Sequence, residues 1–190
     1  KLTRVSLSDN SSGTGGGGIY CIKNSNITLI NTTVTNNLDN NNIADAAGIY
    51  LRNGCQAQVL NSILWNNFPK ELYMDNDNGI EDEDNNYTVF RYSDVQDLSD
   101  LEATYVPSFM EDPVQCQEES PEFVNGDSEG DYNLQFNSPC IDAGSYDPYD
   151  NGTLIIPEDS YLDGDDDGIP VPDMGAYEFE YDNCLGDIDC

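Results

Sequence analysis

The residues best suited to chemistry in this chain are alternate aspartates near its C-terminus. Asp163, Asp165 and Asp167 lead into a glycine, and Asp173 follows after a short proline-containing stretch. Alternate carboxylates in a tight loop direct several hard oxygen atoms to one point, as Ca²⁺ requires. The spacing begins like an EF-hand loop, but Met174 stands where the bidentate acid of that loop belongs. The four aspartates therefore predict a Ca²⁺ site of another kind; the alternative is a solvated acidic loop.

Catalysis by paired carboxylates receives little support from the sequence. Glycoside hydrolases place two carboxyl groups on either side of the scissile bond. With 37 acids in 190 residues, such pairs arise by chance. The acids between Asp75 and Asp84 are irregularly spaced and are interpreted as a solvated loop, while Asp187 and Asp189 are interpreted as half of a further cation site.

Basic side chains offer a second route to chemistry, because lyases that cleave acidic polysaccharides take a proton with Arg or Lys. The only basic pair that falls at neighbouring positions of the sequence repeat described below is Lys23 and Arg52. A chain with a formal charge of -31 would repel a polyuronate, so we interpret both residues as solubilising. The chain has no His, which excludes a Ser–His or Cys–His nucleophile. We therefore assign no catalytic residue.

Three aromatic residues define a predicted ligand face. Tyr20, Tyr50 and Trp65 fall at positions expected to point outward from the strands. Exposed aromatic rings on a rigid face bind sugars by stacking or proteins by burial. The alternative is that the C-terminal part of the chain covers them.

The elements that must position these residues form an internal sequence repeat. Residues 17–37 read GGIYCIKNSNITLINTTVTNN, and residues 47–67 read AGIYLRNGCQAQVLNSILWNN, without a gap at an offset of thirty. Apolar residues alternate with polar ones over short runs broken by Gly and Asn, which indicates strands and turns rather than helices. A period of this length is typical of a solenoid.

The repeat predicts a parallel β-helix in which equivalent side chains of successive coils stack. Weaker copies flank the two strong ones. The expected inward columns are Leu2, Leu29, Val59, Phe90 and Leu7, Val34, Leu64, Val95. Asn31 over Asn61 is expected to form a turn ladder, because Asn tolerates left-handed backbone and its amide can bond to its neighbour. The alternative fold is an antiparallel β-sandwich.

The composition of the chain limits the classes of partner that it is expected to bind. The acidity of the chain repels nucleic acid and anionic membrane surfaces and favours cations. The sequence has no apolar run long enough to cross a bilayer, so we expect neither nucleic-acid binding nor membrane insertion. The six cysteines show no zinc-ligand spacing and favour disulfides and an extracellular setting. Sequential pairing joins Cys116 with Cys140 and Cys184 with Cys190; Cys21 fits a reduced core residue equally well.

The C-terminal half carries a resemblance to a known family. The segments NLQFNSPCIDAG and DGDDDGIPVPDMGAYEF, with the Asn-rich repeats before them, resemble the ending of bacterial extracellular right-handed parallel β-helix proteins of the pectate-lyase-like group. Residues 182–190, DNCLGDIDC, resemble the start of a dockerin or thrombospondin type-3 calcium repeat. The resemblance implies an all-β fold of three to four right-handed coils in a secreted or surface protein.

Three regions follow: β-helix coils over 1–97, a last irregular coil and cap over 98–181, and a linker or truncated calcium repeat over 182–190. We expect a non-enzymatic, calcium-stabilised extracellular module for adhesion, matrix or filament structure. Upstream coils or another copy of the chain are expected to stack on the N-terminal end. The alternative is a carbohydrate-active enzyme fragment or a glycan-binding module.

Overall fold

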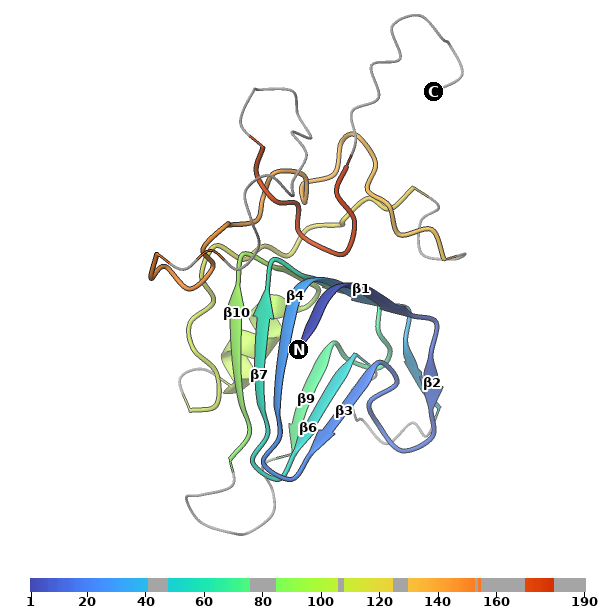
Figure 1. Cartoon of the computed structure of the whole chain (residues 1–190). Coiled ribbons are helices and arrows are strands. Elements are labelled where there is room, and N and C mark those ends of the chain that lie inside the picture. The colour runs from blue at the N-terminus through green and yellow to red at the C-terminus, as the bar shows by residue number, and fades with distance from the viewer. Residues whose placement is uncertain are drawn as a thin grey trace, which may run out of the picture.

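The computed structural model describes residues 1–40, 48–75, 85–105, 108–124, 130–152, 154 and 170–179. The chain is mostly β and forms three parallel sheets that curl around a common interior (Figure 1). The large sheet contains β1 (Leu2–Ser8), β4 (Asn26–Thr35), β7 (Gln56–Leu60), β8 (Ile63–Trp65), β10 (Tyr87–Arg91) and β11 (Asp94–Val95). The second sheet contains β3 (Ile19–Ile22), β6 (Ile49–Arg52) and β9 (Leu72–Asp75). The third sheet contains β2 (Ser11–Ser12) and β5 (Leu38–Asp39). One helix, α1 (Leu98–Tyr105), follows β11.

The strands stack so that equivalent residues of successive repeats pair. The pairings give the two predicted columns, Leu2, Leu29, Val59, Phe90 and Leu7, Val34, Leu64, Val95. Every pairing between strands in the described part of the chain is parallel. The predicted stacking of repeats is therefore confirmed, and the antiparallel sandwich is wrong.

The core consists of the inward columns of the sheets. Leu29, Val59 and Phe90 from the large sheet meet Leu51 and Leu72 from the β3–β6–β9 sheet, and all five are fully buried. Alternate residues of a strand point to opposite faces, so the alternation in the repeat produces this segregation. Each such side chain contributes about 1.5–3 kcal/mol on burial.

A corner divides the strands of the large sheet, and its backbone is left-handed. One residue of each repeat has positive φ there: Arg4 (54°), Asn31 (45°), Asn61 (48°) and Tyr92 (50°). Asn adopts this conformation more readily than other side chains apart from Gly, which explains why the two strongest repeats place Asn at the corner.

The amides of Asn31 and Asn61 do not bond to each other, which corrects the predicted turn ladder. Asn31 Nδ2 donates to the Asp173 carbonyl (2.8 Å), and Asn61 Nδ2 donates to the Ser145 carbonyl (2.7 Å). The ladder between repeats lies instead at a second corner. In this ladder each side-chain amide donates to the next member, from Asn10 to Asn37 and from Asn37 to Asn67, and Asn67 donates to the carboxylate of Glu71.

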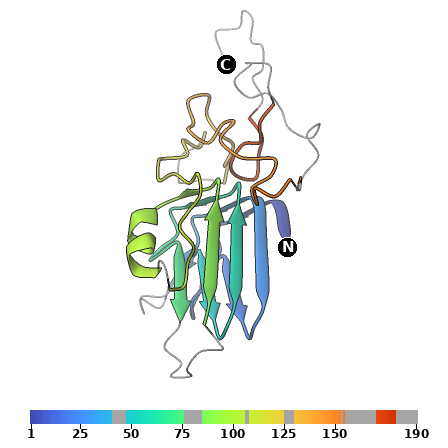
Figure 2. The same ribbon diagram turned by 90° about the vertical axis from the view of Figure 1, so that its left-hand side faces the viewer.

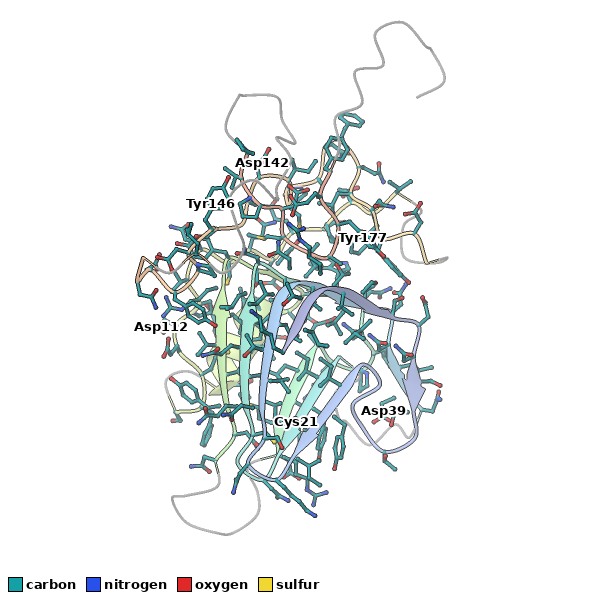
Figure 3. The ribbon with its side chains drawn as sticks, viewed as in Figure 1. Cys21, Asp39, Asp112, Asp142, Tyr146 and Tyr177 are labelled. Atoms are coloured by element: carbon teal, nitrogen blue, oxygen red, sulfur yellow. The ribbon has the colours of Figure 1, made fainter. Side chains whose placement is uncertain are left out.

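The two motifs that carry the family resemblance pack against each other on the Asn31–Asn61 corner. The Met174 N–H donates to the Cys140 carbonyl (2.9 Å), and the Gly175 N–H donates to the Asn61 carbonyl (2.9 Å). In Figure 2 this C-terminal segment, orange to red, lies across the corner ends of the large-sheet strands. Figure 3 shows Asp142, Tyr146 and Tyr177 in the same segment.

The two ends of the stack differ. At the far end, Leu98 and Leu101 of α1 and Met110 join the core, and isolated parallel bridges continue the stacking as far as Gln117. At the N-terminal end, β1, β2 and β3 each pair on one side only, within the described residues. One end is therefore covered, and the other presents an open strand edge.

The four described cysteines are thiols, and the predicted Cys116–Cys140 disulfide is absent. Cys116 packs on the main core, whereas its neighbour Gln117 turns outward and contacts Cys140 (Nε2 to Sγ, 3.6 Å). Adjacent residues of an extended segment face opposite ways, so Cys116 and Cys140 lie on opposite sides of it. Cys184 and Cys190 lie outside the described residues.

Candidate functional site

Of the four predicted calcium ligands, only Asp173 lies within the described residues; Asp163, Asp165 and Asp167 lie outside them. Asp173 is 1% exposed, and its carboxylate accepts N–H groups from Asp142 (2.8 Å) and Phe179. In the described ranges, no group of three or more His, Cys, Asp or Glu residues has a geometry that could hold a metal ion. Asp173 therefore organises the C-terminal segment.

The surroundings of Asp173 are strongly acidic for a buried site. Burial first, and then the charge of Asp142, raise the pKa of Asp173 to about 7. Burial, followed by the charge of Asp173, raises the pKa of Glu178 to about 8, while Arg4 opposes this shift. A low-dielectric site disfavours carboxylates that lie close together, so protonation is favoured in this cluster.

The predicted ligand face is divided between two surfaces. Tyr20 and Tyr50 stack on the outer side of the β3–β6–β9 sheet with ring centroids 5.0 Å apart, and Tyr73 continues the column at 5.5 Å from Tyr50. Tyr20 is 44% exposed at the open edge, but Tyr50 is only 5% exposed. Trp65 belongs to the large sheet and packs against the cluster that contains residues of the C-terminal segment. The three aromatics do not form one open face.

Polar groups surround the tyrosine column. Arg52 Nε forms an ion pair with Asp75 Oδ2 (3.1 Å), which also accepts the Tyr50 hydroxyl (3.2 Å). A hydrogen bond with Tyr20, followed by the charges of Tyr50 and Asp75, raises the pKa of Arg52 above its ordinary value. An arginine held in this way keeps its proton, which makes Arg52 a poor general base.

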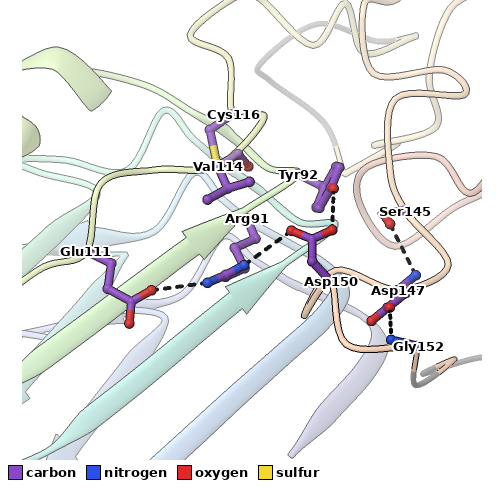
Figure 4. A network of polar contacts seen from close by, with 9 residues as sticks. All are labelled: Arg91, Tyr92, Glu111, Val114, Cys116, Ser145, Asp147, Asp150 and Gly152. Carbon is purple, nitrogen blue, oxygen red and sulfur yellow. Dashed lines mark hydrogen bonds and ion pairs between the residues drawn. The ribbon is translucent and has the colours of Figure 1, made fainter.

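A third outward column is covered by the C-terminal segment. Ile30 and Leu60 are buried beneath Tyr146 and Tyr149. Next to them, Arg91 bridges Glu111 (3.2 Å) and Asp150 (3.5 Å), and Asp150 also accepts the Tyr92 hydroxyl, as Figure 4 shows. Arg91 and Tyr92 thus join Asp150 of the covering segment to the end of β10, and these partly exposed pairs contribute little stability.

The open edge is formed by β1, β2 and β3, each paired on one side only within the described residues. The Asn ladder runs in one direction, with Asn10 N and Nδ2 donating to Asn37 Oδ1 (3.1 and 3.0 Å). The Asn10 side-chain oxygen thus occupies the position at which each ladder Asn accepts from the preceding repeat. Half of the six basic residues, Lys1, Arg4 and Lys23, lie in the first 23 residues, and residues 92–190 contain none. The edge therefore combines unpaired strands, a polar ladder and the most basic part of the chain.

Two residues of these columns were not predicted from the sequence. Glu71 ends the Asn ladder and is buried, and burial raises its pKa to about 8. Tyr73 continues the tyrosine column but follows Tyr50 by twenty-three residues instead of thirty. The similarity between IYLR (49–52) and LYMD (72–75) is the signal that could have identified Tyr73.

The chain matches no protein-family model, no curated protein and no solved structure. Within the part of the chain that the structure describes, no helix has the length and apolarity needed to span a bilayer.

Proposed function

We propose that this chain is a right-handed parallel β-helix module of an extracellular or cell-surface protein, with a structural rather than catalytic role in adhesion, matrix or filament formation. The observation that supports it best is the stack of in-register parallel repeats with one covered end and one open edge. Exposed strand edges are templates for further pairing, and solenoids use them to join neighbouring repeats.

Upstream repeats of the same kind fit the open edge better than a second copy arranged head to tail. A head-to-tail array needs two open ends, whereas α1 and the segment up to Gln117 cover the far one. A preceding repeat with Asn above Asn10 and an aromatic above Tyr20 would extend both columns.

A fused repeat tests this partner. A copy of residues 26–57, with its cysteine changed to Ser, joined ahead of Lys1 continues the register of β1 with β4. We expect a Tm higher by several degrees and a larger urea m-value, because more apolar surface is buried. The matched control carries one extra Gly before Lys1, which turns the added inward column outward. Equal Tm values for both fusions would overturn the proposed partner.

Calcium is proposed to stabilise the module through Asp163, Asp165, Asp167 and Asp173, since hard carboxylate oxygens suit this ion. A chelator should lower Tm, and added Ca²⁺ should restore it, because an ion that binds only the folded state stabilises it. Asp163→Asn with Asp167→Asn should abolish the response. An unchanged Tm in the chelator would contradict the calcium proposal. It would not bear on the proposed upstream repeat, which the fusion tests separately.

The structural role has its own test. The purified chain is incubated with a panel of neutral and acidic polysaccharides, and reducing and unsaturated ends are measured. We expect no release, since Arg52 is held by Asp75 and no nucleophile–His pair exists. Release of either kind of end would replace the structural role with a hydrolase or a lyase.

A further inference from the structure

Cys21 and Cys55 belong to successive repeats and lie inside the same corner of the stack. Cys21 is in β3, and Cys55 directly precedes β7. Both face the main core, with exposures of 4% and 0%. Figure 3 shows Cys21 in the interior, between the small sheet and the large one.

The backbone of this corner holds the two repeats in register. The Asn24 N–H donates to the Asn53 carbonyl (2.8 Å), and the Gln56 N–H donates to the Ser25 carbonyl (3.1 Å). Because Asn26 pairs with Gln56, Ser25 stacks directly on Cys55.

Each thiol turns into this shared turn. Cys21 Sγ donates to the carbonyl of Ser25 (3.4 Å), the residue stacked on Cys55, and Cys55 Sγ donates to the Arg52 carbonyl (3.3 Å). Burial, followed by contact with the Cys55 thiol, raises the pKa of Cys21 to about 12. From stacked positions of successive repeats, both thiols therefore turn into the same closed apolar corner.

We propose that Cys21 and Cys55 form a disulfide that links two successive repeats through the core. Each thiol loses its hydrogen, an S–S bond forms, and the two electrons and two protons reduce a small external disulfide such as oxidised glutathione to two thiols. The link closes the chain between residues 21 and 55 next to the open edge, where the stack has fewest neighbours. This pairing goes beyond the proposed function and does not depend on it.

The fold also determines when the bond forms. Thiol–disulfide exchange requires a thiolate, and a buried thiol of high pKa is almost entirely protonated. The bond therefore forms while the repeats assemble and afterwards resists exchange. Cys116 and Cys140 do not compete for these partners in the folded chain, since Cys140 faces Asp94 (Sγ to Oδ2, 3.1 Å).

The positions of the basic residues allow a direct test. Trypsin cuts after Arg4, Lys23, Arg52, Lys70 and Arg91, so Cys21 and Cys55 fall in peptides 5–23 and 53–70, while the other four cysteines share peptide 92–190. The full chain is refolded with reduced and oxidised glutathione, free thiols are alkylated, and the unreduced digest is analysed by mass spectrometry. We expect peptide 5–23 linked to peptide 53–70, and loss of this species on reduction.

Two outcomes would overturn the pairing: recovery of both peptides separate and alkylated, or either peptide linked to 92–190. Wild-type chain and the control Cys116→Ser/Cys140→Ser should both give the 5–23/53–70 species. The same oxidation in denaturant should give mixed pairings, because only the folded corner selects Cys55 for Cys21. Equal selectivity in denaturant would also count against the proposal.

Discussion

Asn61 shows how one side chain can serve both the repeat and its covering segment. Its backbone is left-handed, with φ of 48°, which Asn and Gly adopt at lower cost than other residues. Its amide donates to the Ser145 carbonyl (2.7 Å), and its side-chain oxygen accepts the Ser145 N–H (3.0 Å). The same residue therefore forms the corner and anchors residues 144–146 to it.

Replacing Asn61 should separate these two contributions. Asn61→Ala should lower the free energy of unfolding by roughly 2–4 kcal/mol, since it adds left-handed strain of about 1–2 kcal/mol and removes the partner of the backbone N–H and C=O of the half-buried Ser145. Asn61→Gly keeps the backbone freedom and should lose about half as much. Urea denaturation of both variants measures the difference. Equal losses would mean that the backbone conformation contributes nothing.

At the scale of elements, the C-terminal segment depends on close backbone approach to the large sheet. Gly175 has φ of 100°, and a Cβ there would lie 2.8 Å from Ile63 Cδ1 and 2.9 Å from Thr33 Oγ1. The next residue, Ala176, donates its N–H to Thr33 Oγ1 (3.0 Å). A larger residue than Gly would push residues 173–177 away from the strands.

Gly175→Ala should therefore detach this segment, and Gly152→Ala is its matched control. Gly152 also has positive φ, 79°, but a Cβ there meets nothing within 4 Å. The control should cost about 1–2 kcal/mol of backbone strain alone, whereas Gly175→Ala should cost roughly 1–3 kcal/mol more through crowding. Hydrogen exchange should become faster over 170–179 only in Gly175→Ala. Similar exchange in both variants would show that crowding is not what requires Gly175.

The strand elements could be predicted wherever the repeat is exact. The thirty-residue offset gave the pairing of Leu29 with Val59, because stacked parallel strands restore the same side chain at the same place. The offset did not predict β9, because Tyr73 follows Tyr50 by seven residues fewer than the thirty-residue repeat requires. The partners of the Asn31 amide were also missed, since local spacing contains no information about a segment more than a hundred residues away. Periodicity reports contacts between repeats and is silent about contacts with the non-repeating cap.

At the scale of the whole molecule, the chain buries carboxyl groups despite its large negative charge. Burial is the largest cause that raises the pKa of Glu71 to about 8, of Asp94 to about 6 and of Asp173 to about 7. The folded state therefore binds protons that the unfolded chain releases. For each group, the stabilisation is complete below its ordinary pKa near 4 and is lost as the pH rises through the raised value.

We accordingly expect the protein to be more stable in mild acid, with Tm falling by about 5–10 °C between pH 5 and pH 8. Of these three groups Glu71 contributes over the widest range, because burial raises its pKa furthest and the charge of Asp97 adds to the cost of ionisation, while the hydrogen bonds from Asn67 oppose the shift. Glu71→Gln removes this titration, so its Tm should fall less over the same interval and exceed that of the wild type at pH 8. The control Glu102→Gln removes an equal charge from the exposed side of α1 and should leave the pH dependence unchanged. If both variants follow the wild-type profile, Glu71 does not link proton binding to folding. A wild-type Tm that rises from pH 5 to pH 8 would contradict the expected stabilisation by acid.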